Sequence, residues 1–176
     1  MPTSLSDAEQ KELERLLEVV VSRDKGFIPD SAYPLIHKLV PWPAVEVLIY
    51  DDNGRFALTY RDDTHFKGWH IPGGYLKVNE SYGEACDRIV RKEKVALGVA
   101  ELKLIASHTW LAGEHPYGYP VSMVIACRAT DETVERDGLR WFLEIPPDVI
   151  IQQHPKFLTY FKEWFKNGAR PTAAII

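Results

Sequence analysis

Residues 73–93, GGYLKVNESYGEACDRIVRKE, constrain the fold of this chain more than any other stretch. Two glycines, which tolerate backbone geometry that other residues resist, come before a helix with spaced glutamates and an arginine. Ser81 and Glu84 have the spacing of a capping box, so we expect the helix to open there and to run to about Lys94. A glycine turn that leads into an acidic helix can hold a divalent cation against a diphosphate, because hard cations take oxygen ligands.

Strand and helix patterns alternate around this helix. Residues 44–50 and 55–61 are strand-like runs, and Asn53-Gly54 between them is a strong hairpin signal. The other expected elements are strands at 69–71, 101–112, 121–129 and 139–145, and an amphipathic helix at 157–165 closed by Asn167-Gly168. We therefore predict an α/β fold with one mixed sheet.

The first 40 residues follow a different, helical pattern. Ser6 and Glu9 form another capping-box pair, and apolar residues then recur on one helical face. A shorter helix is expected from Asp30 to about Val40. We predict that residues 1–40 are a helical extension that packs on the main body or on a second subunit, which would make the protein a homodimer. Residues 41–176 would be the main domain of a single globular unit.

Composition restricts the classes of function. The formal net charge is -4, so no basic surface indicates binding to nucleic acid or to an anionic membrane. No apolar run approaches the roughly 20 residues of a spanning helix, and the polar N-terminus does not resemble a signal peptide. Cys86 and Cys127 are the only cysteines, and we expect them to be reduced and buried. A cytoplasmic protein is the resulting expectation.

The spacing of the central stretch resembles a known motif. Gly74 is followed after five residues by Glu80, after seven more by Arg88, and after four more by Glu93. This spacing resembles the Nudix box, G-x5-E-x7-R-E-U-x-E-E-x-G-U, in which U is aliphatic. The preceding WHIPGG is similar to the usual approach to that box. The resemblance implies a Nudix-type α/β/α sandwich and a hydrolase that depends on Mg²⁺ or Mn²⁺.

Three positions depart from the box. Ile89 and Lys92 stand where it has two of its glutamates, and Val95 replaces its last glycine. Ile89 and Glu93 are four residues apart, so we expect them to share one helical face, on which Glu93 is the only carboxylate. A cluster of several cations is therefore not expected. Lys92 would compete with cation binding or would contact phosphate itself.

Residues from about 28 to 141 are also similar to the GDP-mannose mannosyl hydrolases, a branch that keeps the box arginine and last glutamate but loses intermediate acids. This resemblance implies that the substrate is a nucleoside diphosphate linked to another group, such as the nucleotide sugar GDP-mannose. It implies one Mg²⁺ held by the Gly73 carbonyl, Glu93 and Glu135. Arg136 follows where the branch has its histidine base, and arginine cannot accept a proton at neutral pH.

The same resemblance assigns roles to other polar residues. Glu80 and Arg88 would form an ion pair that fixes the loop against the helix. Arg61 matches an arginine that contacts the diphosphate in that branch, and Arg136 would be a further phosphate contact. Glu46 aligns with an acidic residue of the first strand, although a single acid in AVEVLIY is also typical of a residue that faces outward from a sheet.

The loop GEHPYGYP, residues 113–120, carries the remaining candidates. His115 is a candidate for the missing base, although loop histidines more often have no such role. Tyr117 and Tyr119 would stack on a nucleobase or would anchor the loop.

A second function remains open from the sequence. A Nudix scaffold that binds nucleotides without turning them over would also explain Ile89, Lys92 and Arg136, since none of them supplies a metal ligand or a base.

Overall fold

The computed structural model describes residues 5–23, 32–63, 66–93, 98–115, 118–130, 138–168 and 174–175. Three of the predicted site residues, Tyr117, Glu135 and Arg136, lie outside these ranges.

The described residues form an eight-stranded sheet with the order β3-β2-β1-β6-β5-β8, in which β4 also pairs with β1 and β7 with β2. Its strands are β1 Pro43–Tyr50, β2 Phe56–Asp62, β3 Lys67–His70, β4 Gly73–Tyr75, β5 Val99–Thr109, β6 Val121–Ala129, β7 Leu139–Phe142 and β8 Ala174–Ile175. β1 is antiparallel to β2 and β4 and parallel to β6. The predicted hairpin and the predicted mixed sheet are therefore confirmed.

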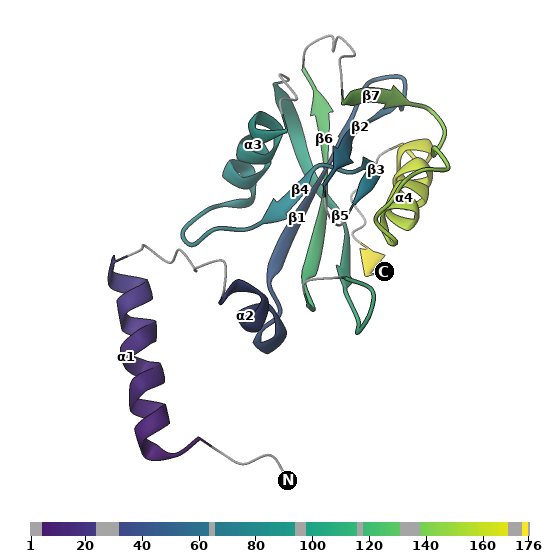
Figure 1. The fold of residues 1–176 in the computed structure, drawn as a ribbon. Helices are drawn as coiled ribbons and strands as arrows, with labels where there is room; N and C mark the ends of the chain where they lie inside the picture. Colours follow the sequence, from purple (N-terminus) through teal and green to yellow (C-terminus); the bar gives the residue numbers. More distant parts are fainter. Residues whose placement is uncertain are drawn as a thin grey trace.

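Helices cover both faces of this sheet. The helices are α1 Asp7–Arg23, α2 Tyr33–Leu39, α3 Tyr82–Lys92 and α4 His154–Lys166. Figure 1 shows α3 on one side of the sheet and α4 on the other, so the predicted α/β/α arrangement is confirmed.

Strand β1 lies between two apolar clusters. Val45, Val47 and Ile49 pack with α3, whereas Leu48 and Tyr50 pack with α4. Because both faces of the strand are covered, its side chains are buried from Ala44 to Tyr50. A strand buried on both faces has no polar alternation, which explains why this segment is a nearly continuous apolar run.

The two glycines before α3 differ from expectation. They belong to strand β4, in which Gly73 pairs with Glu46 and Gly74 with Val45, rather than to a loop. Neither glycine has a positive φ angle. Gly73 is required by space instead, because a Cβ atom built there would collide with Oε2 of Glu46. This close approach brings a carboxylate of β1 against β4.

Helix α1 begins with the predicted capping box, in which Ser6 N–H and Oγ–H both donate to Oε2 of Glu9. Its apolar face does not pack on the sheet: Leu13, Leu16 and Leu17 are about half exposed. Figure 1 shows α1 standing away from the rest of the fold. None of the helices in the described ranges has the length and apolar run that a bilayer-spanning segment requires.

Candidate active site

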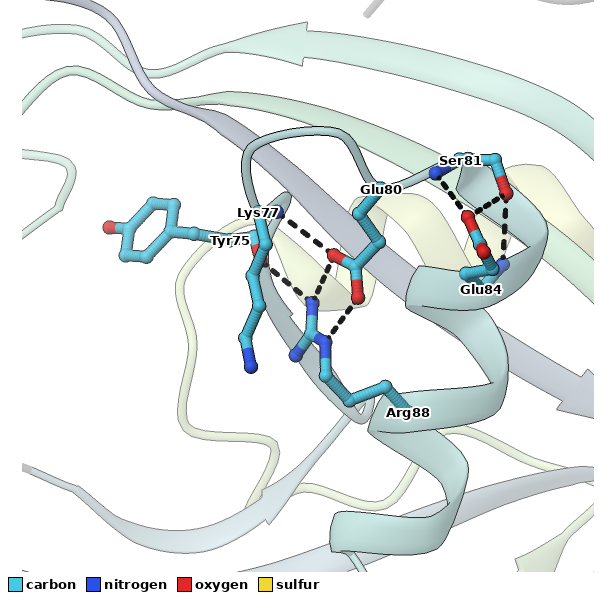
Figure 2. A network of polar contacts seen from close by, with 6 residues as sticks. All are labelled: Tyr75, Lys77, Glu80, Ser81, Glu84 and Arg88. Carbon is cyan, nitrogen blue, oxygen red and sulfur yellow. Dashed lines mark hydrogen bonds and ion pairs between the residues drawn. The ribbon is translucent and has the colours of Figure 1, made fainter. Parts of the chain in front are cut away.

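A bidentate ion pair joins the loop before α3 to the helix. Nε of Arg88 donates to Oε1 of Glu80 over 2.5 Å, and Nη2 donates to Oε2 over 2.7 Å. The same Nη2 donates to the carbonyl of Tyr75 over 2.9 Å, while the Lys77 N–H donates to Glu80. Figure 2 shows Arg88 reaching from α3 to both β4 and the loop. The predicted ion pair is therefore present, and it connects three segments.

This ion pair changes the pKa of Glu80. The hydrogen bonds from Arg88, assisted by the Lys77 N–H, lower the pKa of Glu80 from its ordinary 4.5 to about 2. Glu80 is therefore ionised at every physiological pH, so it remains an acceptor for Arg88.

The start of α3 is fixed by the predicted capping box. The Ser81 N–H donates to Oε2 of Glu84 over 2.8 Å, and the Glu84 N–H donates to Oγ of Ser81 over 3.3 Å (Figure 2). A defined first turn sets the rotation of the whole helix. The direction in which later residues of α3 point is therefore determined at its beginning.

A cleft of about 610 Å³ lies beside α3 and β4. Five of the predicted site residues line it: Arg61, Gly73, Arg88, Glu93 and His115. Tyr119 does not line the cleft and is 43% exposed, so its contact with a base stays a prediction. Two other tyrosines, Tyr33 and Tyr75, form an aromatic part of the wall.

Arg61 is held at the edge of the cleft by neighbours on the β2–β3 connection. Its Nε donates to the carboxylate of Asp63, and its guanidinium lies 4.7 Å from the centre of the Phe66 ring. All three residues line the cleft. An anionic ligand would therefore meet a pre-positioned guanidinium.

The last turn of α3 carries residues that differ in burial. Ile89 is 1% exposed and packs in the cluster with Val45 and Cys86, whereas Lys92 and Glu93 line the cleft. Glu93 occupies the C-cap, and its N–H still donates to the Ile89 carbonyl over 3.0 Å, so the helical spacing behind the predicted shared face is kept. Cys86 and Cys127 are both buried free thiols, as expected.

The site has few groups that could hold a metal ion. No group of three or more His, Cys, Asp and Glu side chains converges on a metal position within the described ranges. Glu93 and the backbone of Gly73 nevertheless line the same cleft, which is open to a ligand. Mg²⁺ in proteins is commonly held by one or two carboxylates, with the remaining oxygens from water and substrate phosphates. These residues therefore fit one sparsely held cation.

A buried polar cluster that sequence reasoning missed lies on β1, β6 and α4. The sequence left open whether Glu46 matches the acidic residue of the related branch or faces outward from the sheet, and in the structure it is only 8% exposed and lines the cleft. Its Oε1 accepts a hydrogen bond from Oγ of Ser122 over 3.0 Å, and Ser122 accepts one from Nε1 of Trp110 over 2.8 Å. Its Oε2 lies 3.4 Å from Nε2 of His154.

The tautomer of His154 follows from its backbone contact. The Ile71 N–H donates to Nδ1 over 3.0 Å, so Nδ1 carries no proton and the neutral ring carries it on Nε2, facing Glu46. Burial alone raises the pKa of Glu46, but the interactions with His154 and Ser122 outweigh it, and the net pKa is lowered. Glu46 is therefore a buried, ionised carboxylate.

Two further histidines line the cleft. His70 is 5% exposed and contacts the Ile71 carbonyl through Nδ1 over 2.8 Å and Thr59 Oγ1 through Nε2 over 3.1 Å. Burial, reinforced by His154, lowers the pKa of His70 to about 4. His115 packs against the Trp110 ring at 5.2 Å between centres, and burial lowers its pKa also. Both rings are therefore neutral at pH 7.

One signal could have revealed Glu46 from the sequence: it is the only charged residue within AVEVLIY, a run apolar enough to be buried on both faces. An acid in such a strand needs polar partners inside the fold. Its partner His154 lies 108 residues away and has no local motif, so sequence alone offered no means of pairing them.

Comparison with protein families identifies one match. A model described as the NUDIX domain matches residues 40–166, which is well over half of the chain. No curated protein sequence matches the chain significantly.

Three solved structures with a similar fold are distant from this chain in sequence. An ADP-ribose pyrophosphatase from Streptococcus suis has 17% identity and a TM-score of 0.60, with 78% of this chain and 100% of that chain covered. A NUDIX hydrolase from Nitrosomonas europaea has 20% identity and a TM-score of 0.55, with coverage of 77% and 78%. A UDP-X diphosphatase has 16% identity and a TM-score of 0.55, with coverage of 98% and 89%. At these identities the likeness concerns the fold.

Proposed function

The chain belongs to the NUDIX family of hydrolases, and we propose that it cleaves a nucleoside diphosphate linked to another group, with a nucleotide sugar such as GDP-mannose as the substrate class. One observation supports this most directly. Arg61 on β2, Gly73 on β4, and the adjacent Lys92 and Glu93 at the end of α3 come from three segments and line one cleft. Cationic side chains and a cation ligand on the same cleft match the needs of a diphosphate.

The cationic groups would bind and orient the diphosphate. Arg61 offers a planar fork of donors, and Lys92 a point charge, on opposite elements of the cleft. The Asp63 carboxylate occupies Nε of Arg61 but leaves its other nitrogens as donors. Arg136, outside the described residues, is proposed as a further phosphate contact.

Glu93 and the carbonyl of Gly73 would hold Mg²⁺ or Mn²⁺, with Glu135 proposed as the third ligand. When bound, such a cation neutralises phosphate charge and polarises the bond that breaks. Glu80 and Arg88 would act indirectly, because their ion pair fixes β4 and the loop against the helix that ends in Glu93. His115, neutral and on the cleft, is the proposed proton acceptor.

The nucleoside is proposed to contact the aromatic wall. Tyr33 and Tyr75 line the cleft with their rings 6.3 Å apart, edge to face. Tyrosine rings offer large rigid surfaces to a base. Tyr119, and Tyr117 outside the described residues, stay proposed as further contacts of the base.

Residues 1–40 are proposed as an extension to a domain that spans 41–176, and as the contact between two subunits. The apolar side of α1 supports this proposal, because Leu13, Leu16 and Leu17 are about half exposed and Val21 is 72% exposed. A second copy of the chain would cover these side chains in a homodimer.

A nucleotide-binding module without turnover is the alternative. It is favoured by Ile89, which is buried, and by Lys92, which places a positive charge beside Glu93. Neither residue supplies a metal ligand.

A substrate panel separates the two functions. Nucleoside diphosphate sugars with different bases and sugars are incubated with Mg²⁺ or Mn²⁺ in ¹⁸O-labelled water, and products are identified by mass. Product formation with label on phosphate or on the sugar supports a hydrolase and shows which bond breaks. Tight binding by calorimetry without any product contradicts hydrolysis and supports the binding module.

A further inference from the structure

The cleft carries a negative group that the proposed diphosphate contacts do not use. Glu46 lines the same cleft as Arg61 and Lys92, but it is an acceptor, not a donor. A phosphate oxygen placed against it would be repelled. The part of a ligand that faces Glu46 must therefore supply hydrogen-bond donors.

The carboxylate is held in one position by the surrounding structure. Ser122 fixes Oε1, Nε2 of His154 faces Oε2, and the missing side chain of Gly73 makes room for it. Each carboxylate oxygen has about two acceptor sites, so each retains capacity for one more donor. Glu46 is buried yet lines the cleft, so this capacity faces the ligand.

The neighbouring polar groups on the floor of the cleft are occupied. His70 uses both ring nitrogens on Thr59 and on the Ile71 carbonyl. Ser122 donates its proton to Glu46 and accepts from Trp110. Of these three side chains, Glu46 is therefore the one that keeps acceptor capacity for a ligand.

The fixed position of Glu46 suits it to bind hydroxyl groups. Ser122 donates to Oε1, and Nε2 of His154 lies 3.4 Å from Oε2, so both carboxylate oxygens are held by the fold. A fixed carboxylate is a strong acceptor for hydroxyl groups, because hydrogen bonds to charged acceptors are strong.

We propose that Glu46, positioned by Ser122 and His154, accepts hydrogen bonds from hydroxyl groups of the moiety linked to the nucleoside diphosphate and thereby selects a sugar-like group. This inference rests on the proposed function. It assigns Glu46 to substrate specificity, separate from the residues that contact phosphate.

The test compares ligands with and without the sugar. Binding of a nucleoside diphosphate, of its sugar derivative and of deoxyfluoro-sugar analogues is measured by calorimetry in EDTA, which prevents turnover. For the wild type, the sugar derivative should bind more tightly than the nucleoside diphosphate, and replacement of at least one hydroxyl by fluorine should remove this gain. Glu46→Gln should weaken binding of the sugar derivative about 10- to 100-fold and that of the nucleoside diphosphate less than about twofold.

Two variants separate recognition from folding. Glu144→Gln removes a carboxylate that is 80% exposed outside the cleft and should bind every ligand like the wild type. Ser122→Ala keeps the Glu46 carboxylate but loses its Oε1 donor, and it should weaken binding of the sugar derivative less than Glu46→Gln does. The fluorinated ligands test the proposal on the wild type, so they do not depend on any variant folding.

Three results would overturn the proposal. If the wild type binds the nucleoside diphosphate and its sugar derivative equally, or if no fluorinated analogue binds more weakly, Glu46 does not recognise hydroxyls, while the proposed function stands. If Glu46→Gln weakens both ligands to the same extent, Glu46 has a structural or phosphate-related role. If the wild type binds none of the ligands in EDTA, this inference fails, whereas the proposed function is decided separately by the substrate panel with Mg²⁺ or Mn²⁺.

Discussion

The two ends of helix α3 differ in how closely their residues match the family motif. At its beginning, Glu80 and Arg88 make two mutual hydrogen bonds, and Ser81 and Glu84 complete a capping box. At its end, one buried apolar residue and one lysine stand where the family motif has glutamates, and Glu93 alone remains. The first end shapes the backbone, whereas the second carries the residues proposed to bind the cation and the phosphate.

This difference teaches that the motif consists of two separable parts. The ion pair at the first end fixes the local geometry, because it joins β4, the loop and α3. The residues at the second end can vary as long as side chains and bound cations together still neutralise the charge of the ligand. Where the family motif has two glutamates, this chain has an isoleucine and a lysine, which changes the charge of these two positions from -2 to +1. A negatively charged ligand therefore needs fewer bound metal ions to neutralise it.

Ile89→Glu should produce the largest effect. The side chain would place a carboxylate in the apolar cluster, where an unpaired buried charge costs about 3–5 kcal/mol. Denaturant unfolding measures the loss, and Ile89→Val, expected to cost about 0.5–1.5 kcal/mol, is the control. A stable Ile89→Glu variant that gains Mn²⁺ affinity would show that the end of α3 can still accept a full set of ligands.

Glu93→Gln should reduce Mg²⁺-dependent turnover by at least about tenfold, since the amide removes the charge that holds the cation. The free energy of unfolding should change by less than about 0.5 kcal/mol, because the side chain is partly exposed. Asp87→Asn, on the exposed side of the same helix, is the matched control for steady-state kinetics. Turnover near the wild-type rate would remove Glu93 from the metal site.

Glu80→Gln should destabilise the fold by about 1.5 kcal/mol at pH 7, because it removes the charged acceptor of Arg88. The folded-state pKa of about 2 lies below the ordinary 4.5. The stabilisation is therefore complete above pH 4.5 and decreases as the pH falls towards 2. Unfolding midpoints from pH 7 to pH 3 should show the wild type and the variant converging in acid.

A double-mutant cycle identifies the source of that loss. Combining Glu80→Gln with Arg88→Gln should cost less than the sum of the two single changes, since each removes the same interaction. Additive losses would show that the two side chains stabilise the fold independently.

Lys92→Gln should have the smallest effect, a rise of about two- to fivefold in KM with little change in stability, because an exposed point charge contributes modestly to phosphate binding. The effect should decrease at high salt. Arg91→Gln, one residue earlier and outside the cleft, should leave KM unchanged. An unchanged KM in Lys92→Gln would mean that this charge does not meet the ligand.

Much of the fold was predictable because its signals are local. The hairpin turn at Asn53-Gly54, the capping box at Ser81 and the aromatic face of α4 each depend on residues within one or two turns of chain. Strands β4 and β8 were not predicted, because a strand of two or three residues is defined by its partner and not by its own pattern.

The site was predictable only where a motif covers it. Glu80, Arg88 and Glu93 follow from spacing, whereas the contact of Ile71 with His154 joins residues 83 positions apart. The burial of Ile89 in an apolar cluster likewise follows from how α3 packs on the sheet. Such details depend on packing, to which local sequence is a weak guide.

Strand β1, which carries Glu46, is hydrogen-bonded to β2, β4 and β6. Its amide protons should therefore be among the last to exchange with deuterium, since their release requires the whole sheet to open. The floor of the cleft should therefore open only when the whole domain unfolds. On heating, ligand binding should persist up to the cooperative unfolding transition and be lost in that same transition.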